Sequence, residues 1–135
     1  MYTHEMQIRV RYGETDQMGY CYYGNYAEYF EVGRVETLRS LGLSYRSLEE
    51  SGIMLPVLEL HVKYIRPAYY DDLLTLRTSI AELPGARIRF TYELMNEQGQ
   101  KINEAETTLV FINKNTNRPC PAPNALLDKL RPFFS

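Results

Sequence analysis

The sequence predicts an α+β fold: a five-stranded antiparallel sheet with one long helix covering one of its faces. Apolar residues alternate with polar ones in five segments, which is the period of a half-buried strand. Another segment near the start of the chain repeats its apolar residues at three- and four-residue steps, which is the period of a helix. Short turns separate the last four strands, and turns this short join antiparallel neighbours. One helix must then cover one face of the sheet.

The first strand and the long helix come early in the chain. Alternation over 6–10 predicts the strand, and His4, close to the chain start, is expected to be frayed. The helix is predicted to run from about Tyr23 or Gly24 to Leu41. Its apolar face consists of Tyr26, Phe30, Gly33, Thr37 and Leu41.

Glycines mark the packing and the end of this helix. Gly33 lies in the apolar face and predicts a close approach to the sheet, since a glycine in mid-helix otherwise costs about 1 kcal/mol. Gly42 is expected to end the helix as a C′ residue. The elements predicted after it are a short helix over 44–51, strands over 58–64, 74–80, 88–94 and 101–113, and a short helix over 125–134.

Composition narrows the class of protein. A chain of 135 residues with 44% hydrophobic and 24% charged residues is predicted to form one domain over 1–135. A net charge of -2 gives no electrostatic case for nucleic acid. The sequence has no signal-peptide pattern, and no apolar run approaches the roughly 20 residues of a membrane span. Cys21 and Cys120 form no CxxC and are expected to be free thiols in a reducing compartment, so a cytoplasmic protein is predicted.

The stretch from Arg11 to Arg39 carries the candidate chemistry. It changes from strand to polar loop to helix, and Asp16 lies in the loop. A helix N-terminus offers unpaired N–H groups and a positive dipole end, which suit developing negative charge. An acid beside such a helix start indicates a hydrolytic centre. The alternative is that Asp16 caps the helix, but it lies several residues before the helical pattern begins.

Other chemistries find little support in the sequence. Two histidines and two scattered cysteines match no metal-ligand spacing. The chain has no GxSxG, no Walker-type glycine loop and no dinucleotide fingerprint. Twelve tyrosines and no tryptophan indicate either half-buried surfaces, such as interfaces and ligand walls, or simple drift in aromatic usage.

The residues from Tyr12 to Glu31, YGETDQMGYCYYGNYAEYFE, resemble the opening motif of a known family. That family is the 4-hydroxybenzoyl-CoA thioesterase-like branch of the hotdog-fold acyl-CoA thioesterases. The later run VKYIRPAYYDDLLTLRT also resembles its second and third strands with their connecting turn. The resemblance implies a hotdog fold, in which the five-stranded sheet wraps around one long central helix. It also implies thioester hydrolysis without a metal or redox cofactor.

The resemblance implies roles for two catalytic positions. Asp16 matches the family's catalytic carboxylate, either a general base for water or a nucleophile that forms a transient anhydride. The backbone N–H of Tyr23 matches the donor that polarises the thioester carbonyl. Many members carry histidine at that position, and the tyrosine leaves the backbone donor intact.

The resemblance also implies substrate-binding positions, which are Tyr12, Gly19, Tyr22, Asn25 and Glu31. Glu31 either faces the pocket or pairs with Arg34 on the helix surface. The expected substrate is an acyl-CoA, and the tyrosines near the site suggest a flat or aromatic acyl group. The alternatives are a thioesterase acting on acyl carrier protein and a non-catalytic acyl-thioester binding module. The resemblance further implies a homo-oligomer, a dimer or a dimer of dimers, with sites at subunit interfaces.

Overall fold

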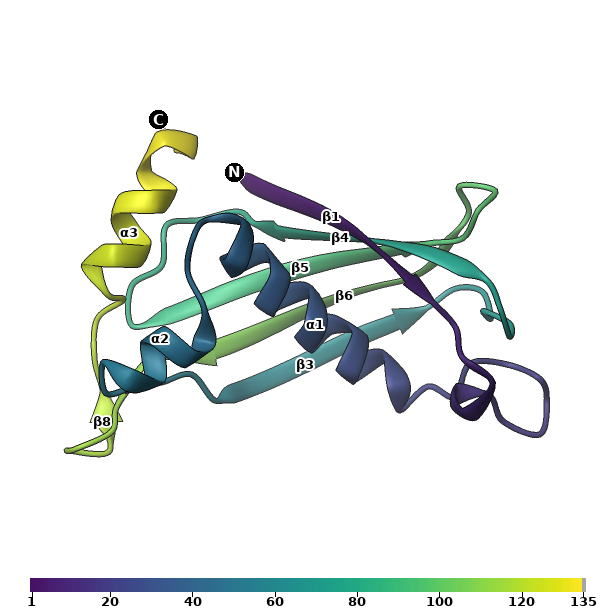
Figure 1. The fold of residues 1–135 in the computed structure, drawn as a ribbon, viewed down its shortest axis with the longest axis horizontal. Helices are drawn as coiled ribbons and strands as arrows, with labels where there is room; N and C mark the ends of the chain where they lie inside the picture. Colours follow the sequence, from purple (N-terminus) through teal and green to yellow (C-terminus); the bar gives the residue numbers. More distant parts are fainter. Residues whose placement is uncertain (135) are drawn as a thin grey trace.

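The sheet and the long helix form two layers (Figure 1). The computed structural model describes residues 1–134. Five antiparallel strands lie in the order β1-β4-β5-β6-β3, and α1 (Asn25–Ser40) lies across one face. The strands are β1 (Tyr2–Arg9), β3 (Val57–Tyr64), β4 (Leu73–Ile80), β5 (Arg87–Met95) and β6 (Lys101–Val110). The predicted α+β fold class is confirmed.

Shorter elements surround the two layers. A 3-10 turn, η1 (Tyr12–Glu14), follows β1, and α2 (Tyr45–Glu50) follows α1. A second sheet of three very short strands in the order β2-β7-β8 was not predicted, because two-residue strands leave no period to read. The remaining elements are β2 (Ile53–Met54), β7 (Ile112–Asn113), β8 (Arg118–Pro119), α3 (Asn124–Leu130) and η2 (Arg131–Phe133).

Helix α1 packs closely on the sheet where Gly33 meets β4. A Cβ built on Gly33 would lie 2.6 Å from Leu76 Cδ2 and 2.8 Å from Thr78 Oγ1. Phe30 and Leu38, on the same face, are fully buried. The predicted close approach at Gly33 is therefore confirmed, and the missing side chain is what lets the two layers meet there.

The ends of α1 differ slightly from the prediction. The helix begins at Asn25, with Gly24 at the N-cap, so Tyr23 lies in the turn that precedes the helix. At the other end, Gly42 has a positive φ of 84° and donates its N–H to the Arg39 carbonyl at 2.9 Å. That is the expected C′ conformation.

Strand β1 starts earlier than the alternation indicated. It begins at Tyr2 and pairs with β4 over its whole length, so that His4 lies opposite Thr78 and is half-buried. The expectation that His4 is frayed is wrong, because β4 extends far enough to supply backbone partners to the first residues. The terminal amino group also donates to the Phe133 carbonyl at 2.7 Å.

Strand β3 lies at an edge of the sheet with apolar side chains exposed. Leu58, Leu60 and Tyr64 are 47%, 42% and 54% exposed.

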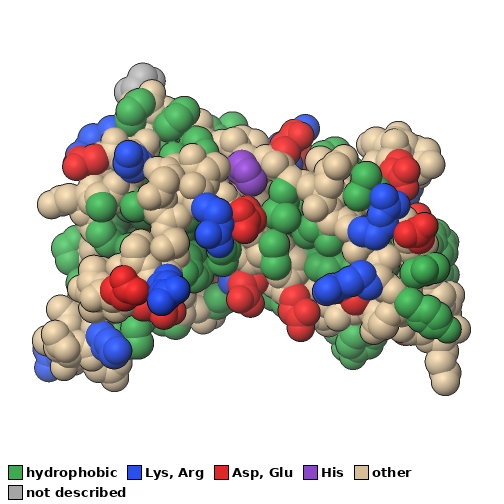
Figure 2. Space-filling model, viewed as in Figure 1, with side chains coloured by type: hydrophobic (Ala, Val, Ile, Leu, Met, Phe, Trp, Pro, Cys, Tyr) green, Lys and Arg blue, Asp and Glu red, His purple; other side chains and the backbone are tan. Residues whose placement is uncertain are grey.

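On the face that carries α1, basic and acidic side chains are interspersed rather than grouped by sign (Figure 2). None of the helices within residues 1–134 is long and apolar enough to cross a membrane.

Candidate active site

Asp16 organises the loop that precedes α1. Its Oδ1 accepts the N–H groups of Met18 at 2.9 Å and Tyr20 at 3.2 Å. Its own N–H donates to the Tyr20 carbonyl at 2.8 Å, and Gly19 takes a positive φ of 81° to close the turn. Asp16 is therefore not the N-cap of α1. Its second carboxylate oxygen, Oδ2, accepts no hydrogen bond from residues 1–134 and remains free for chemistry.

A pocket of about 300 Å³ opens beside this loop. Its lining comes from the Asp16 loop, the start of α1 and the end of β3, and includes Asp16, Cys21, Tyr23, Tyr26, Tyr64 and Arg66. The structure thus brings the two predicted catalytic residues into one pocket. Tyrosine rings form much of its wall: Tyr64 lies 6.3 Å from Tyr23 and 6.0 Å from Tyr26 between ring centroids.

A larger hollow, of about 570 Å³, lies on the sheet face opposite α1, but it is a poor candidate for the site. Its lining is dominated by charged side chains that pair with one another. Lys101 Nζ, for example, contacts Glu93 at 3.1 Å and Glu104 at 3.0 Å. Such a surface is well solvated and offers less apolar area to an acyl group than the Asp16 pocket does.

The turn before α1 presents free backbone donors. The N–H groups of Asn25 and Tyr26 donate to the carbonyls of Tyr22 at 2.9 Å and Tyr23 at 3.2 Å. Within residues 1–134, by contrast, no group accepts from the N–H of Tyr23 or Gly24. Unpaired N–H groups at a helix start are suited to hold an oxyanion.

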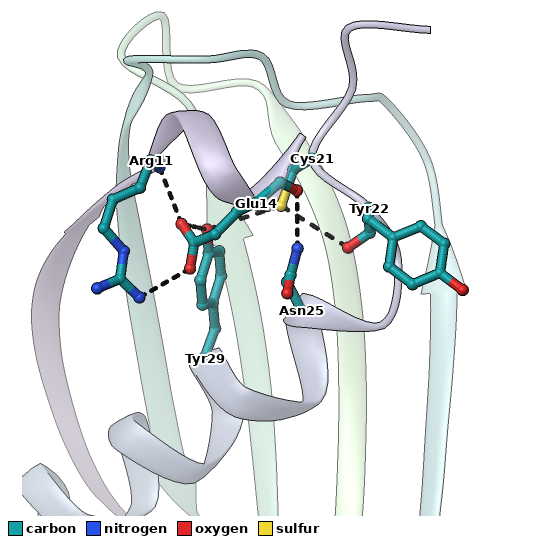
Figure 3. A network of polar contacts seen from close by, with 6 residues as sticks. All are labelled: Arg11, Glu14, Cys21, Tyr22, Asn25 and Tyr29. Atoms are coloured by element: carbon teal, nitrogen blue, oxygen red, sulfur yellow. Dashed lines mark hydrogen bonds and ion pairs between the residues drawn. The ribbon is translucent and has the colours of Figure 1, made fainter. Parts of the chain in front are cut away.

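Glu14 is a buried carboxylate that was not predicted from the sequence. The residue is 8% exposed, and its side chain lies in a network with Arg11 and Tyr29 (Figure 3). Oε1 accepts the Arg11 backbone N–H and the Tyr29 hydroxyl, both at 2.8 Å, and Oε2 accepts Arg11 Nη2 at 2.9 Å. Burial acts to raise the pKa of this carboxyl, but the hydrogen bonds from Arg11 and Tyr29 outweigh burial and hold the pKa below its ordinary value. In the sequence, the only sign of this network is the three-residue separation of Arg11 and Glu14.

The main chain of Glu14 also fixes the start of the helix. Its carbonyl accepts the Tyr22 N–H at 2.8 Å and the Asn25 side-chain amide at 2.7 Å. Asn25 was predicted to bind substrate, and here its Nδ2 is committed to the protein's own backbone (Figure 3).

Three other predicted substrate-binding residues, Tyr12, Gly19 and Tyr22, do not line the pocket. Tyr12 is 73% exposed and its ring lies 5.6 Å from that of Tyr70. Gly19 shapes the Asp16 loop, and the Tyr22 ring packs on Gly24, where an added Cβ would lie 2.7 Å from the ring. Roles of these residues in binding substrate stay predictions.

Glu31 lies apart from the Asp16 pocket. It is exposed and borders a separate hollow between α1 and β3, together with Arg34. The expected pair between them is not formed, because Arg34 is buried and donates instead to the hydroxyls of Tyr45 and Tyr92, each at 3.3 Å.

Cys21 lines the pocket but behaves as a packing residue. It is 4% exposed, and its thiol donates weakly to the Tyr29 hydroxyl at 3.6 Å. Burial raises the pKa of the thiol, so it stays protonated near neutral pH. No group of three or more His, Cys, Asp or Glu side chains within residues 1–134 is arranged to hold a metal ion.

Comparison with known proteins places the chain in a family. A family model described as the thioesterase-like superfamily matches residues 10–130. The chain belongs to this superfamily. The resemblance carried by the segment from Tyr12 to Glu31 is thereby confirmed.

Relatives in the superfamily match over most of the chain. The acyl-CoA thioesterase YbgC of Haemophilus influenzae is 38% identical over 86% of this chain and 85% of its own. A chloroplast acyl-acyl carrier protein thioesterase of Arabidopsis thaliana is 31% identical over 97% of this chain and 69% of its own. The crystal structure of a DHNA-CoA thioesterase from Staphylococcus aureus superposes with a TM-score of 0.85 at 34% identity, covering 99% of this chain and 85% of the other. This match confirms the predicted hotdog fold.

Proposed function

We propose that this protein is an acyl-CoA thioesterase that hydrolyses an acyl-CoA to the free acid and CoA. The observation that carries the proposal is the shared pocket of Asp16 and Tyr23. Within residues 1–134, Asp16 offers a carboxylate oxygen that has no hydrogen-bond partner, and Tyr23 offers a backbone N–H that has no acceptor. The names of the relatives, acyl-CoA thioesterases among them, support the same reaction.

In one route Asp16 acts as a general base. Its Oδ2 takes a proton from a water molecule as the water oxygen attacks the thioester carbon. The electrons of the C=O double bond move onto the carbonyl oxygen, and the Tyr23 N–H stabilises the resulting oxyanion. When the double bond re-forms, the C–S bond breaks and the CoA thiolate leaves, taking the proton from Asp16.

In the second route Asp16 is the nucleophile. Oδ2 attacks the thioester carbon, the C–S bond breaks, and a mixed anhydride forms as the thiolate leaves. Water then hydrolyses the anhydride and restores the carboxylate. The Tyr23 N–H has the same task in both routes, because an oxyanion develops in each.

The pocket wall supports a flat acyl group. Tyr23, Tyr26 and Tyr64 present aromatic rings along the pocket, and aromatic groups pack well against such rings. A second candidate is hydrolysis of acyl groups held on acyl carrier protein, which the relative from Arabidopsis thaliana supports.

The deciding experiment measures thiol release from a panel of acyl-CoAs that includes benzoyl and straight-chain members. Wild type is expected to release CoA, and Asp16→Asn is expected to lose about 10²- to 10⁴-fold in rate. Wild type that binds these substrates without releasing thiol would identify a binding module instead. Matched acyl-CoA and carrier-bound substrates, compared by turnover, separate the two thioesterase candidates.

The assembly is proposed to be a homo-oligomer, a dimer or a dimer of dimers. Edge strand β3 leaves backbone groups and apolar side chains such as Leu60 uncovered, and a second copy paired along β3 would cover them. The pocket lies at the end of β3, so a partner would add to its wall.

The thiols of Cys21 and Cys120 are free, which supports a reducing, cytoplasmic location.

A further inference from the structure

We propose that Glu14 is a positioning residue that sets the separation between the Asp16 carboxylate and the Tyr23 N–H donor. This inference rests on the proposed function, since both groups must meet one thioester carbonyl. Glu14 itself lies outside the pocket lining and acts through these two residues.

The donor side is held by the Glu14 carbonyl. That oxygen accepts the N–H of Tyr22 at 2.8 Å and the side-chain amide of Asn25 at 2.7 Å. Tyr22 precedes Tyr23 by one residue and Asn25 follows it by two. The turn that presents the free N–H is thus tied to one atom on both sides.

The acid side is held through the chain that leaves Glu14. Thr15 pairs with Cys21 in an antiparallel bridge, and the Asp16 N–H donates to the Tyr20 carbonyl at 2.8 Å. Together with the contact between Glu14 and Tyr22, these pairs form a short hairpin with Asp16 at its turn end. Acid and donor therefore lie on two arms that are hydrogen-bonded to each other.

The side chain of Glu14 then anchors this hairpin to the helix. Its Oε1 accepts from the Tyr29 hydroxyl at 2.8 Å, one turn into α1, while Arg11, at the start of η1, donates to both oxygens (Figure 3). A buried carboxylate held by three donors has one orientation, which is how a supporting residue fixes catalytic geometry.

The simpler explanation is that Glu14 only stabilises the fold, and a set of variants separates the two. Tyr29→Phe removes the anchor without changing the backbone, and Glu14→Gln removes the charge. Tyr92→Phe is the matched control: it also deletes a buried tyrosine hydroxyl, one that bonds Thr107 at 2.7 Å and accepts from Arg34 at 3.3 Å. Each variant is characterised by kcat and KM with the best acyl-CoA and by its thermal midpoint.

Tyr29→Phe and Glu14→Gln are expected to lower kcat by about 10- to 100-fold with KM changed less than about 3-fold, because misplacement costs rate rather than ground-state binding. Tyr92→Phe is expected to keep wild-type kcat, although its thermal midpoint falls about as much as that of Tyr29→Phe. A spectroscopic readout accompanies the kinetics. In an Asp16→Asn background, the carbonyl stretching frequency of bound acyl-CoA should be lower than that of free acyl-CoA. Adding Tyr29→Phe should reduce this difference.

Two results overturn the inference while leaving the proposed function in place. One is an active wild type with unchanged kcat in Tyr29→Phe. The other is that Tyr29→Phe and Tyr92→Phe lower kcat by the same factor and Tyr29→Phe leaves the carbonyl stretch unaffected. That result assigns Glu14 to stability alone. A wild type that hydrolyses no thioester overturns the proposed function itself, so the two failures are distinguishable.

Discussion

The hydroxyl of Tyr29 donates a 2.8 Å hydrogen bond to the carboxylate of Glu14, fifteen residues earlier in the chain. This bond joins the first turns of α1 to the loop that precedes the helix. The pKa of Tyr29 is raised by burial and by its contacts with Cys21 and Glu14, so its hydroxyl keeps the proton and acts as the donor. The pKa of Glu14 is held below its ordinary value, so the acceptor stays ionised.

This pairing predicts a pH-dependent contribution to stability. A carboxyl whose pKa is lower in the folded state binds protons more readily when unfolded, so its stabilising effect is present above the ordinary pKa, near 4.5, and is lost as pH falls through the lower folded value. The difference in unfolding free energy between wild type and Glu14→Gln should therefore shrink from pH 6 to pH 3. Denaturant titrations at several pH values measure it, and other carboxylates cancel in the difference. A difference that stays constant over this range would contradict the lowered pKa.

Only the nucleophilic route for Asp16 can place solvent oxygen in the protein. In a single turnover in H₂¹⁸O, water that attacks the thioester carbon leaves the label in the released acid alone. An anhydride attacked at the Asp16 carbon instead places the label in the protein, which mass spectrometry of the Asp16 peptide detects. Label in that peptide contradicts the general-base route, and Asp16→Asn serves as the unlabelled control.

Gly33→Ala tests the close approach of α1 to β4. Alanine gains up to about 1 kcal/mol in helix propensity. Its Cβ would, however, lie 2.6 Å from Leu76 Cδ2 and 2.8 Å from Thr78 Oγ1, which overpacks the interface at a cost of about 1–3 kcal/mol. We expect net destabilisation of about 1 kcal/mol in urea unfolding. A stabilised variant would show that the layers separate easily here.

The two thiols are predicted to react at different rates. Cys21 is buried and its pKa is raised by burial, whereas Cys120 is partly exposed. Iodoacetamide at pH 8 should label Cys120 well before Cys21, as peptide mass spectrometry can follow. Cys21→Ala should retain thioesterase activity within about 3-fold, because a neutral buried thiol is not the nucleophile. Complete loss of activity in a folded Cys21→Ala would refute this.

The proposed pairing along β3 can be tested by measuring the molecular mass of the assembly in solution. Leu60 on β3 and Leu83 in a turn are each 42% exposed, so they form a matched pair. Leu60→Lys should shift the chain toward monomer in light scattering, since a buried unpaired charge disfavours the interface. Leu83→Lys should leave the mass unchanged. An unaltered oligomer in Leu60→Lys would place the interface elsewhere.

Local periodicity determined much of this protein. The alternating strands, the helical repeat that forms α1, and the close packing at Gly33 all follow from patterns within a few residues. The motif around Asp16 and Tyr23 also lies in one short stretch, and its resemblance to the thioesterase family is what predicts both residues. Pattern alone missed the first residues of β1, since His4 is ordered by a partner strand far away in sequence.

What only the tertiary structure decided is which residues meet across long separations. The sheet order β1-β4-β5-β6-β3 leaves β3 at an edge, and no periodicity encodes that order. Glu14 looks like an ordinary surface acid in the sequence, yet the fold buries it against Arg11 and Tyr29 and turns it into a link between loop and helix. The physical reason is that repeat patterns report which face of an element is buried, while hydrogen-bond partners depend on how the chain returns to itself.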